Sequence, residues 1–124
     1  STHIGLLMVR ADGLRELVDR GDATGDDAAL ALATLLAEGV GLEAVCRLGP
    51  DLFAVIIAGA DDPAVQSASA RVRQRWNSVR PAGHELALSV GAGSRPPGAS
   101  VASTAQTLID DSSRSLTAAR ARAA

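Results

Sequence analysis

Hydrophobic residues occur along the chain in runs of different length and period, and these runs predict its strands and helices. Residues 4–10 form a continuous apolar run that ends in a polar residue, a pattern typical of a central strand buried on both faces. A second apolar stretch, residues 45–58, is interrupted by Gly-Pro-Asp-Leu at residues 49–52. Proline presets φ for the first central position of a tight turn, and aspartate suits the second. A β-hairpin is therefore predicted over about residues 42–58.

The remaining segments predict helices and one more strand. Apolar residues at helical spacing indicate helices over residues 13–20, from just after Gly25-Asp26 to Gly39, from Asp61 to about residue 79, and over residues 101–124. Residues 84–92 alternate, with Leu86, Leu88 and Val90 on one face, and predict a strand followed by a loop over residues 93–100. The order strand, helix, helix, hairpin, helix, strand, helix indicates an α+β domain.

All four predicted helices have apolar anchors, which are Leu14, Leu17 and Val18 in the first helix and Leu32, Leu35 and Leu36 in the second. In the helix that starts at Asp61-Asp62-Pro63 the expected buried side chains are Val65, Ala68, Val72, Trp76 and Val79, with Arg71, Arg73 and Arg75 on a solvated face. In the last helix the expected anchors are Leu108, Ile109 and Leu116. Trp76 is the only tryptophan and is expected in the core or at its edge.

Composition narrows the class of protein. The 124 residues suit one domain, and a hydrophobic content of 47% with a net charge of −2 predicts an ordinary globular protein that binds no nucleic acid. No apolar run approaches the ~20 residues that cross a bilayer, so no membrane insertion of this domain is expected. Its expected location is the cytoplasm. The chain begins almost directly in a strand, which favours a domain excised from a larger multidomain protein.

The cysteine and the two histidines are not expected to act in catalysis or metal binding. The single cysteine, Cys46, excludes an internal disulfide and a multi-cysteine metal cluster, and its apolar surroundings predict a buried side chain. His3 and His84 are isolated in sequence, without partners at ligand spacing, so neither is expected to bind metal or to act in catalysis.

The predicted hairpin carries a motif. Residues 47–53, Arg-Leu-Gly-Pro-Asp-Leu-Phe, resemble the signature Arg-x-Gly-Gly-Asp/Glu-Glu-Phe of the GGDEF (diguanylate cyclase) family. The degenerate signature consists of Gly49, Pro50, Asp51, Leu52 and Phe53. Further matches in the same order lie at residues 12–19, 21–26, 88–91 and 108–120. The resemblance extends along nearly the whole chain, so residues 1–124 are expected to form a single domain of this kind, and it implies a mainly antiparallel five-stranded sheet flanked by helices, as in nucleotide cyclases.

The same resemblance implies that the metal site is lost. Family members join two GTP molecules into cyclic di-guanylate with the help of metal ions, which need clustered carboxylates. The first metal-binding aspartate falls on Arg10, while the second acid remains as Asp51. At ~4 Å and an effective dielectric near 20, each unit of charge beside the ion changes its electrostatic energy by ~4 kcal/mol. Tight Mg²⁺ binding is therefore not expected next to the positive charge of Arg10. Leu52 replaces a glutamate, and Pro50 replaces a glycine whose N–H it cannot supply.

Some nucleotide-binding positions are kept. In the family an asparagine and an acid bind the guanine base; the asparagine position is Val18 here, but the acid is present as Asp26. The position of the phosphate-binding lysine is occupied by Arg120. Candidate nucleotide-binding residues are therefore Arg15, Asp26, Arg47 and Arg120. The product-inhibition motif Arg-x-x-Asp falls on residues 40–43, which lack the arginine, so tight feedback binding is not expected.

These residues predict a relative of diguanylate cyclases that is no longer an enzyme and holds no metal or other cofactor. We expect a regulatory or protein-interaction module of a bacterial signalling protein, with other domains or proteins as partners and a homodimer as an open alternative. A weak sensor of GTP or a guanine dinucleotide is the alternative function. Because the family places both positions at one metal, we also expect Arg10 to pair with Asp51. The alternative is that Arg10 points to solvent.

Overall fold

The computed structural model describes residues 3–21, 23–39, 44–79, 86–96 and 101–123. The elements in chain order are β1 (Ile4–Ala11), α1 (Leu14–Asp19), α2 (Ala23–Gly39), β2 (Ala44–Arg47), β3 (Leu52–Ala58), α3 (Asp62–Val79), β4 (Leu88–Arg95) and α4 (Val101–Ala123). This order is the one that the apolar pattern predicts. Among the described residues no helix is long and apolar enough to cross a membrane.

The strands form one antiparallel sheet in the order β2-β3-β1-β4. The predicted central strand is confirmed, because β1 pairs with β3 on one side and with β4 on the other and is buried along most of its length. The described residues contain four strands, whereas the family resemblance implied five. The chain's own apolar pattern supports only four strands, and residues 80–85 lie outside the described part.

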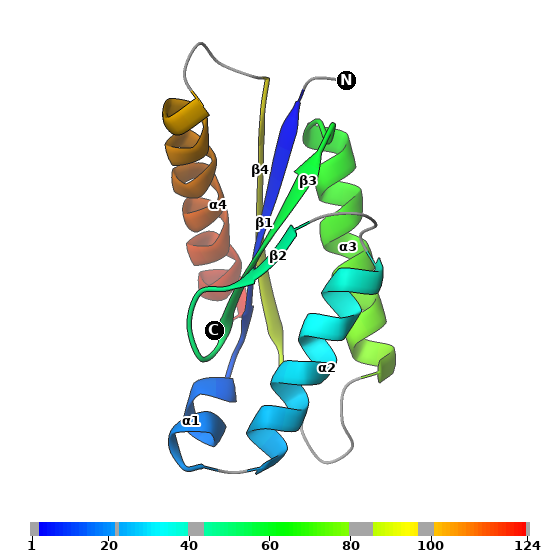
Figure 1. Ribbon diagram of the computed structural model, residues 1–124, viewed down its shortest axis with the longest axis vertical. Helices are drawn as coiled ribbons and strands as arrows, with labels where there is room; N and C mark the ends of the chain where they lie inside the picture. Colours follow the sequence, from blue (N-terminus) through cyan, green and yellow to red (C-terminus); the bar gives the residue numbers. More distant parts are fainter. Residues whose placement is uncertain (1–2, 22, 40–43, 80–85, 97–100, 124) are drawn as a thin grey trace.

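Helices cover the two faces of the sheet unequally. α2 and α3 lie on one face, and α4 lies on the other (Figure 1). The larger core is formed between the sheet and α1, α2 and α3, and a smaller cluster under α4 contains Leu6, Met8, Ala54 and Leu116. Alternate residues of β1 supply the two clusters, as the period of a strand requires.

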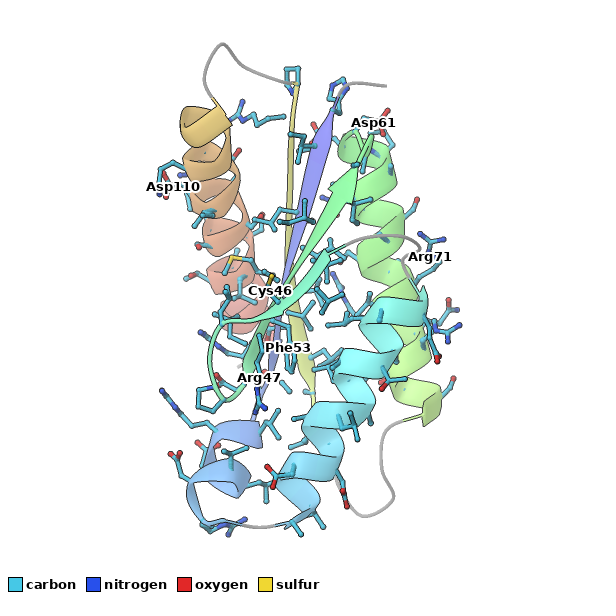
Figure 2. The ribbon with its side chains drawn as sticks, viewed as in Figure 1. Cys46, Arg47, Phe53, Asp61, Arg71 and Asp110 are labelled. Carbon is cyan, nitrogen blue, oxygen red and sulfur yellow. The ribbon has the colours of Figure 1, made fainter. Side chains whose placement is uncertain are left out.

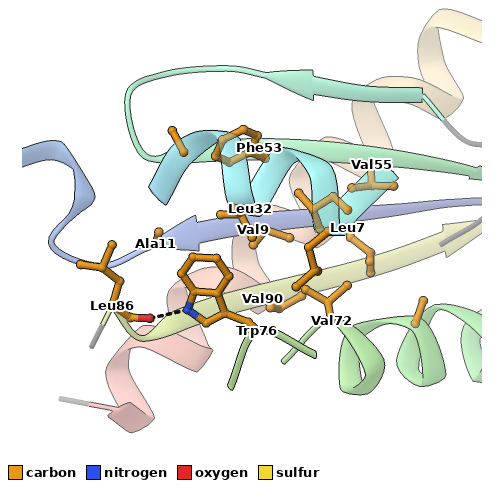
Figure 3. Packing of buried hydrophobic residues seen from close by; sticks show 14 of the residues in the cluster. Leu7, Val9, Ala11, Leu32, Phe53, Val55, Val72, Trp76, Leu86 and Val90 are labelled. Atoms are coloured by element: carbon orange, nitrogen blue, oxygen red, sulfur yellow. Dashed lines mark hydrogen bonds between the residues drawn. The ribbon is translucent and has the colours of Figure 1, made fainter. Parts of the chain in front are cut away.

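Trp76 is the largest side chain of the main core. It is 1% exposed, as predicted for this residue, and its indole Nε1 donates a hydrogen bond of 2.7 Å to the carbonyl oxygen of Leu86 (Figure 3). A buried indole needs such a partner. Val65, Ala68 and Val72 of α3 are buried on the same side, which confirms the predicted apolar face, and Val79 has no described side chain. Arg71, Arg73 and Arg75 are exposed, as predicted.

Several predicted boundaries are corrected. α2 begins at Ala23, so Gly25 and Asp26 lie inside its first turns and do not precede it. The last strand runs from Leu88 to Arg95, and therefore includes residues 93–95 that were predicted as loop. Glycine-containing sequence reads as loop, but here Gly91 and Gly93 pair with Met8 and Leu6 of β1 in the sheet. The predicted start of α3 is confirmed, because the Asp61 carboxylate accepts a hydrogen bond of 3.0 Å from the amide of Ala64.

Two burial predictions are wrong. Cys46 is exposed, because it lies on the α4 side of the edge strand β2 and α4 packs mainly on β4 and β1, whereas Val45 packs against the main core. Ile109 is 45% exposed and does not anchor α4. Leu116 is buried as predicted, and the side chain of Leu108 lies outside the described residues.

Candidate functional site

The candidate site lies at the end of the sheet where β1 meets the turn of the β2–β3 hairpin. The amide of Ala11 donates a hydrogen bond of 3.0 Å to the carbonyl oxygen of Asp51, which joins the end of β1 to the turn. Arg10 is the Cα partner of Leu52 in the register of β1 and β3. Sheet pairing therefore brings two distant parts of the sequence to the same place.

Arg10 and Asp51 form an ion pair there. Arg10 Nε lies 3.7 Å from Asp51 Oδ2, and the two side chains are 26% and 17% exposed. The predicted pairing is found, and the alternative of an arginine directed only to solvent is not. The distance exceeds the 2.7–2.9 Å of a charge-assisted hydrogen bond, and Arg10 Nε has no hydrogen-bond partner in the described part of the chain. The contact is therefore an electrostatic pairing and not the bidentate bond that arginine can form.

A second polar contact lies beside this pair and was not predicted. Ser89 is the Cα partner of Arg10 on β4, and its hydroxyl donates a hydrogen bond of 3.0 Å to Asp12 Oδ2. The amide of Asp12 also donates a hydrogen bond of 2.8 Å to the carbonyl of Ala87. These contacts fix the segment between β1 and α1. Only the strand register reveals them, because the two residues are far apart in sequence.

The Arg47 side chain stabilises the hairpin turn through hydrogen bonds to its backbone. Its Nε donates to the carbonyl of Gly49 at 3.1 Å, and its Nη2 donates to the carbonyl of Pro50 at 2.7 Å. The guanidinium lies 5.7 Å from the ring centroid of Phe53, close enough for a cation–π contact. Figure 2 shows both side chains at the hairpin end of the sheet. Arg47 was predicted as a candidate nucleotide ligand, and its contacts with the turn could not be read from the sequence.

A cavity of about 330 Å³ opens between α2 and the hairpin. It is lined by Asp26, Ala29, Leu30, Ala33, Val45, Arg47 and Phe53. The structure thus brings together two of the candidate nucleotide-binding residues, Asp26 and Arg47. Arg15 is exposed on α1 and does not line this cavity, and the side chain of Arg120 lies outside the described residues.

The side chains at the candidate site do not fit a Mg²⁺ ion. Mg²⁺ requires oxygen ligands in near-octahedral geometry. At the end of β1 the carboxylate of Asp51 can supply an oxygen ligand, but Arg10 stands where the family has a second carboxylate, and its guanidinium cannot bind a cation. No group of three or more His, Cys, Asp and Glu side chains that could hold a metal exists within the described ranges.

Comparison with known proteins identifies the family. Residues 1–123 match the family described as diguanylate cyclase, GGDEF domain. A comparison with curated protein sequences finds no match. The active GGEEF domain of a diguanylate cyclase from Vibrio cholerae has a similar structure, with a TM-score of 0.82 at 17% identity over 98% of this chain and 78% of that one.

Two further solved structures share the fold. The GGDEF domain of DgcB from Caulobacter crescentus, in complex with c-di-GMP, gives a TM-score of 0.77 at 21% identity, over 96% of this chain and 72% of that one. The diguanylate cyclase SiaD from Pseudomonas aeruginosa, in complex with its activator SiaC, gives 0.77 at 19% identity, over 98% of this chain and 47% of that one. The match to the family along almost the entire sequence shows that this chain belongs to the GGDEF family of diguanylate cyclase domains.

Proposed function

We propose that this chain is a non-catalytic GGDEF domain that serves as a regulatory or protein-interaction module of a larger bacterial signalling protein in the cytoplasm. The observation that carries the proposal is the ion pair between Arg10 and Asp51, 3.7 Å apart where β1 ends. Family activity depends on metal ions, and a cation that already neutralises the remaining acid opposes binding of a second cation.

The hairpin supports the same proposal. Pro50 has no N–H to offer a phosphate group, and Leu52 can neither bind metal nor accept a proton. The turn carbonyls of Gly49 and Pro50 are engaged by Arg47, which favours a turn with a structural role. Among similar proteins, the diguanylate cyclase SiaD binds an activator protein. A non-catalytic interaction module would likewise bind a protein partner but would not synthesise cyclic di-guanylate.

The first test is a cyclase assay. We expect no cyclic di-guanylate above the blank when the chain, brought together as an artificial dimer, is incubated with GTP and Mg²⁺ or Mn²⁺. The physical reason is the loss of metal ligands at Arg10 and Leu52 together with the altered turn at Pro50. Product would be measured by chromatography, with an active diguanylate cyclase assayed in parallel. Clear turnover of GTP would contradict the proposal.

A nucleotide sensor is the second candidate function, and the cavity between α2 and the hairpin favours it. The cavity is lined mainly by apolar residues, together with Asp26 and Arg47. A planar ring could lie against the apolar lining, and Asp26 could accept hydrogen bonds from its edge. Such a domain would bind a guanine nucleotide without converting it.

Thermal unfolding separates the two candidate functions. A ligand present at ~100 times its Kd stabilises the folded state by ~2.7 kcal/mol. For an interaction module we expect GTP, GDP and cyclic di-guanylate to leave the Tm unchanged, with and without Mg²⁺. The control variant is Asp26→Asn, which removes the acid but keeps the size of the side chain. A rise in Tm that Asp26→Asn abolishes would instead support the sensor.

A further inference from the structure

The cavity between α2 and the hairpin exists because α2 presents two alanines to the sheet. The α2 side of the cavity is one stripe of the helix, at spacing i, i+3, i+4 and i+7: Asp26, Ala29, Leu30 and Ala33. Val45 and Phe53 lie on the opposite side. The alanine side chains are too short to fill the space against these two residues, so the cavity stays open.

The cavity has the size of a site for a small ligand. Its volume of about 330 Å³ lies at the lower end of the ~300–1,000 Å³ range of ligand pockets. Leu30 is 68% exposed, which places it where the cavity meets solvent. A ligand of the size of an amino acid can therefore enter and fill the cavity, whereas most of a nucleoside triphosphate or of a cyclic dinucleotide would lie outside it.

Two opposite charges border this cavity without neutralising each other. Asp26 and Arg47 both line it, but no ion pair joins these two described side chains. The carboxylate of Asp26 can only accept hydrogen bonds, and the guanidinium of Arg47 can only donate them. A ligand that matches both must present a donor to one and an acceptor to the other.

The hydrogen bonds of Arg47 leave the end of its guanidinium available. Nε and Nη2 donate to the carbonyl oxygens of Gly49 and Pro50 in the hairpin turn, which uses the side of the guanidinium group. Of the five N–H groups, one on each Nη atom then remains at the far end. This parallel pair has the geometry that binds the two oxygens of a carboxylate. The turn thus fixes Arg47 in place for such a contact.

The balance of charge disfavours a ligand with phosphate groups. A phosphate group carries a charge of about −1.5 to −2, and it would lie in a small cavity that Asp26 also borders. Arg47 supplies a single positive charge against it. Arg10 is paired with Asp51 and does not line the cavity. A ligand with one positive and one negative group matches the two charges of the cavity.

A peptide segment also fits this cavity poorly, whether it belongs to the same polypeptide or to another protein. The amide groups of its backbone are neutral, so it would place no charge against Asp26 or Arg47 except through a side chain of one sign. Covering a carboxylate without a partner is costly. A free amino acid carries both charges on one carbon atom, and an apolar side chain would lie against Ala33 and Val45.

We propose that the cavity between α2 and the hairpin binds a free α-amino acid with an apolar side chain. Its ammonium group donates to the carboxylate of Asp26, and its carboxylate accepts from the two N–H groups at the end of Arg47. The site goes beyond the proposed function, because it gives a regulatory module without catalysis a small molecule to sense. Arg47 also contacts the turn, so the ligand would be coupled to the hairpin.

Thermal unfolding and titration calorimetry test the class of ligand. The chain would be measured with valine, leucine, methionine and phenylalanine, each at millimolar concentration, and we expect a rise in Tm with at least one of them. The amino acid with the largest effect would then be compared with its methyl ester and its N-acetyl derivative. Each derivative lacks one of the two charged contacts, so we expect its dissociation constant to be at least about tenfold higher.

Two pairs of variants test the location. Asp26→Asn should raise the dissociation constant at least about tenfold, whereas Asp27→Asn, at an exposed neighbour that does not line the cavity, should bind like the wild type. Ala33→Leu should fill the cavity and abolish binding without lowering the Tm of the free chain. Ala37→Leu, at an exposed position of α2, is its control. Circular dichroism would verify that each variant is folded.

Several results would overturn this inference. They are the absence of binding by all four amino acids, and binding that both Asp26→Asn and Ala33→Leu leave unchanged. An N-acetyl amino acid amide resembles a residue within a polypeptide, and if it binds as tightly as the free amino acid, the cavity belongs to a peptide segment. Binding of GTP or GDP that Asp26→Asn abolishes would assign the cavity to the nucleotide sensor. The cyclase assay alone decides whether the chain is non-catalytic, so the two proposals fail separately.

Discussion

Gly91→Ala is expected to destabilise the fold by roughly 3 kcal/mol or more, because overpacking against a fixed backbone is poorly relieved. Gly91 lies on β4, opposite Met8 of β1 and directly under α4. A Cβ atom added there would lie 2.2 Å from the carbonyl oxygen of Ser112 and 2.6 Å from the amide nitrogen of Leu116. Both atoms belong to the backbone of α4, so the helix as a whole would have to move away from the sheet.

Urea unfolding followed by the fluorescence of Trp76, the only tryptophan, measures this effect. The matched control is Gly49→Ala in the hairpin turn, where an added Cβ meets nothing within 4 Å. We expect that variant to remain within about 1 kcal/mol of the wild type, since alanine in place of glycine also restricts the unfolded chain. Equal unfolding midpoints for Gly91→Ala and the wild type would show that α4 does not pack as closely as described.

The end of the same strand marks a limit of the sequence prediction. Periodicity predicted β1, the hairpin and α3, because each of these elements carries a long and regular apolar pattern. It did not predict that β4 continues through Gly93 to Arg95, because a strand with glycine, serine and arginine resembles a loop. The pairing of Gly93 and Ser94 with Leu6 and Gly5 of β1 is a tertiary contact that a single sequence does not display.

Burial on β2 and α4 could not be predicted for a similar reason. Cys46 and Ile109 are apolar residues in regular elements, and an apolar pattern alone predicts that both are buried. Whether they are covered depends on where α4 lies, and α4 packs mainly on β4 and β1.

The candidate site was predictable only in part. The family resemblance placed Arg10 and Asp51 at one site, and the ion pair follows from that placement. The cavity that contains both Asp26 and Arg47 agrees with the proposal that these residues border one site. The contacts of Arg47 with the turn carbonyls could not be predicted, because they depend on the path of the turn that Pro50 and Asp51 create.

Arg10→Asp, which restores the acid that the family has at the end of β1, is expected to weaken the fold rather than to create an enzyme. Two carboxylates at ~4 Å would repel by ~4 kcal/mol at an effective dielectric near 20. Because both side chains are partly exposed, we expect a smaller loss of about 1–3 kcal/mol. Mg²⁺ should recover part of this loss, since it can neutralise the new carboxylate pair, and it should have no effect on the wild type.

Thermal unfolding with and without Mg²⁺ measures both effects. Arg95→Asp is the matched control, because it reverses the charge in another ion pair, in which Arg95 Nη2 lies 2.9 Å from Asp111 Oδ2. Asp111 keeps a second cationic partner in Arg114. The Tm of this control should therefore not depend on Mg²⁺. A Tm of Arg10→Asp that equals the wild-type value in the absence of Mg²⁺ would show that the ion pair contributes nothing measurable.

Cyclase activity of Arg10→Asp should remain at the blank even where Mg²⁺ stabilises the variant. Pro50 still removes the N–H and the backbone freedom that the family has in the turn, and Leu52 still replaces the glutamate of the signature. Val18 still lacks the amide that the family uses to read guanine. Residues that act as a unit lose activity non-additively, so restoring one of them recovers little. Cyclic di-guanylate formed by this single variant would mean that Arg10 alone suppresses the reaction, and that the changes at Pro50, Leu52 and Val18 are compatible with catalysis.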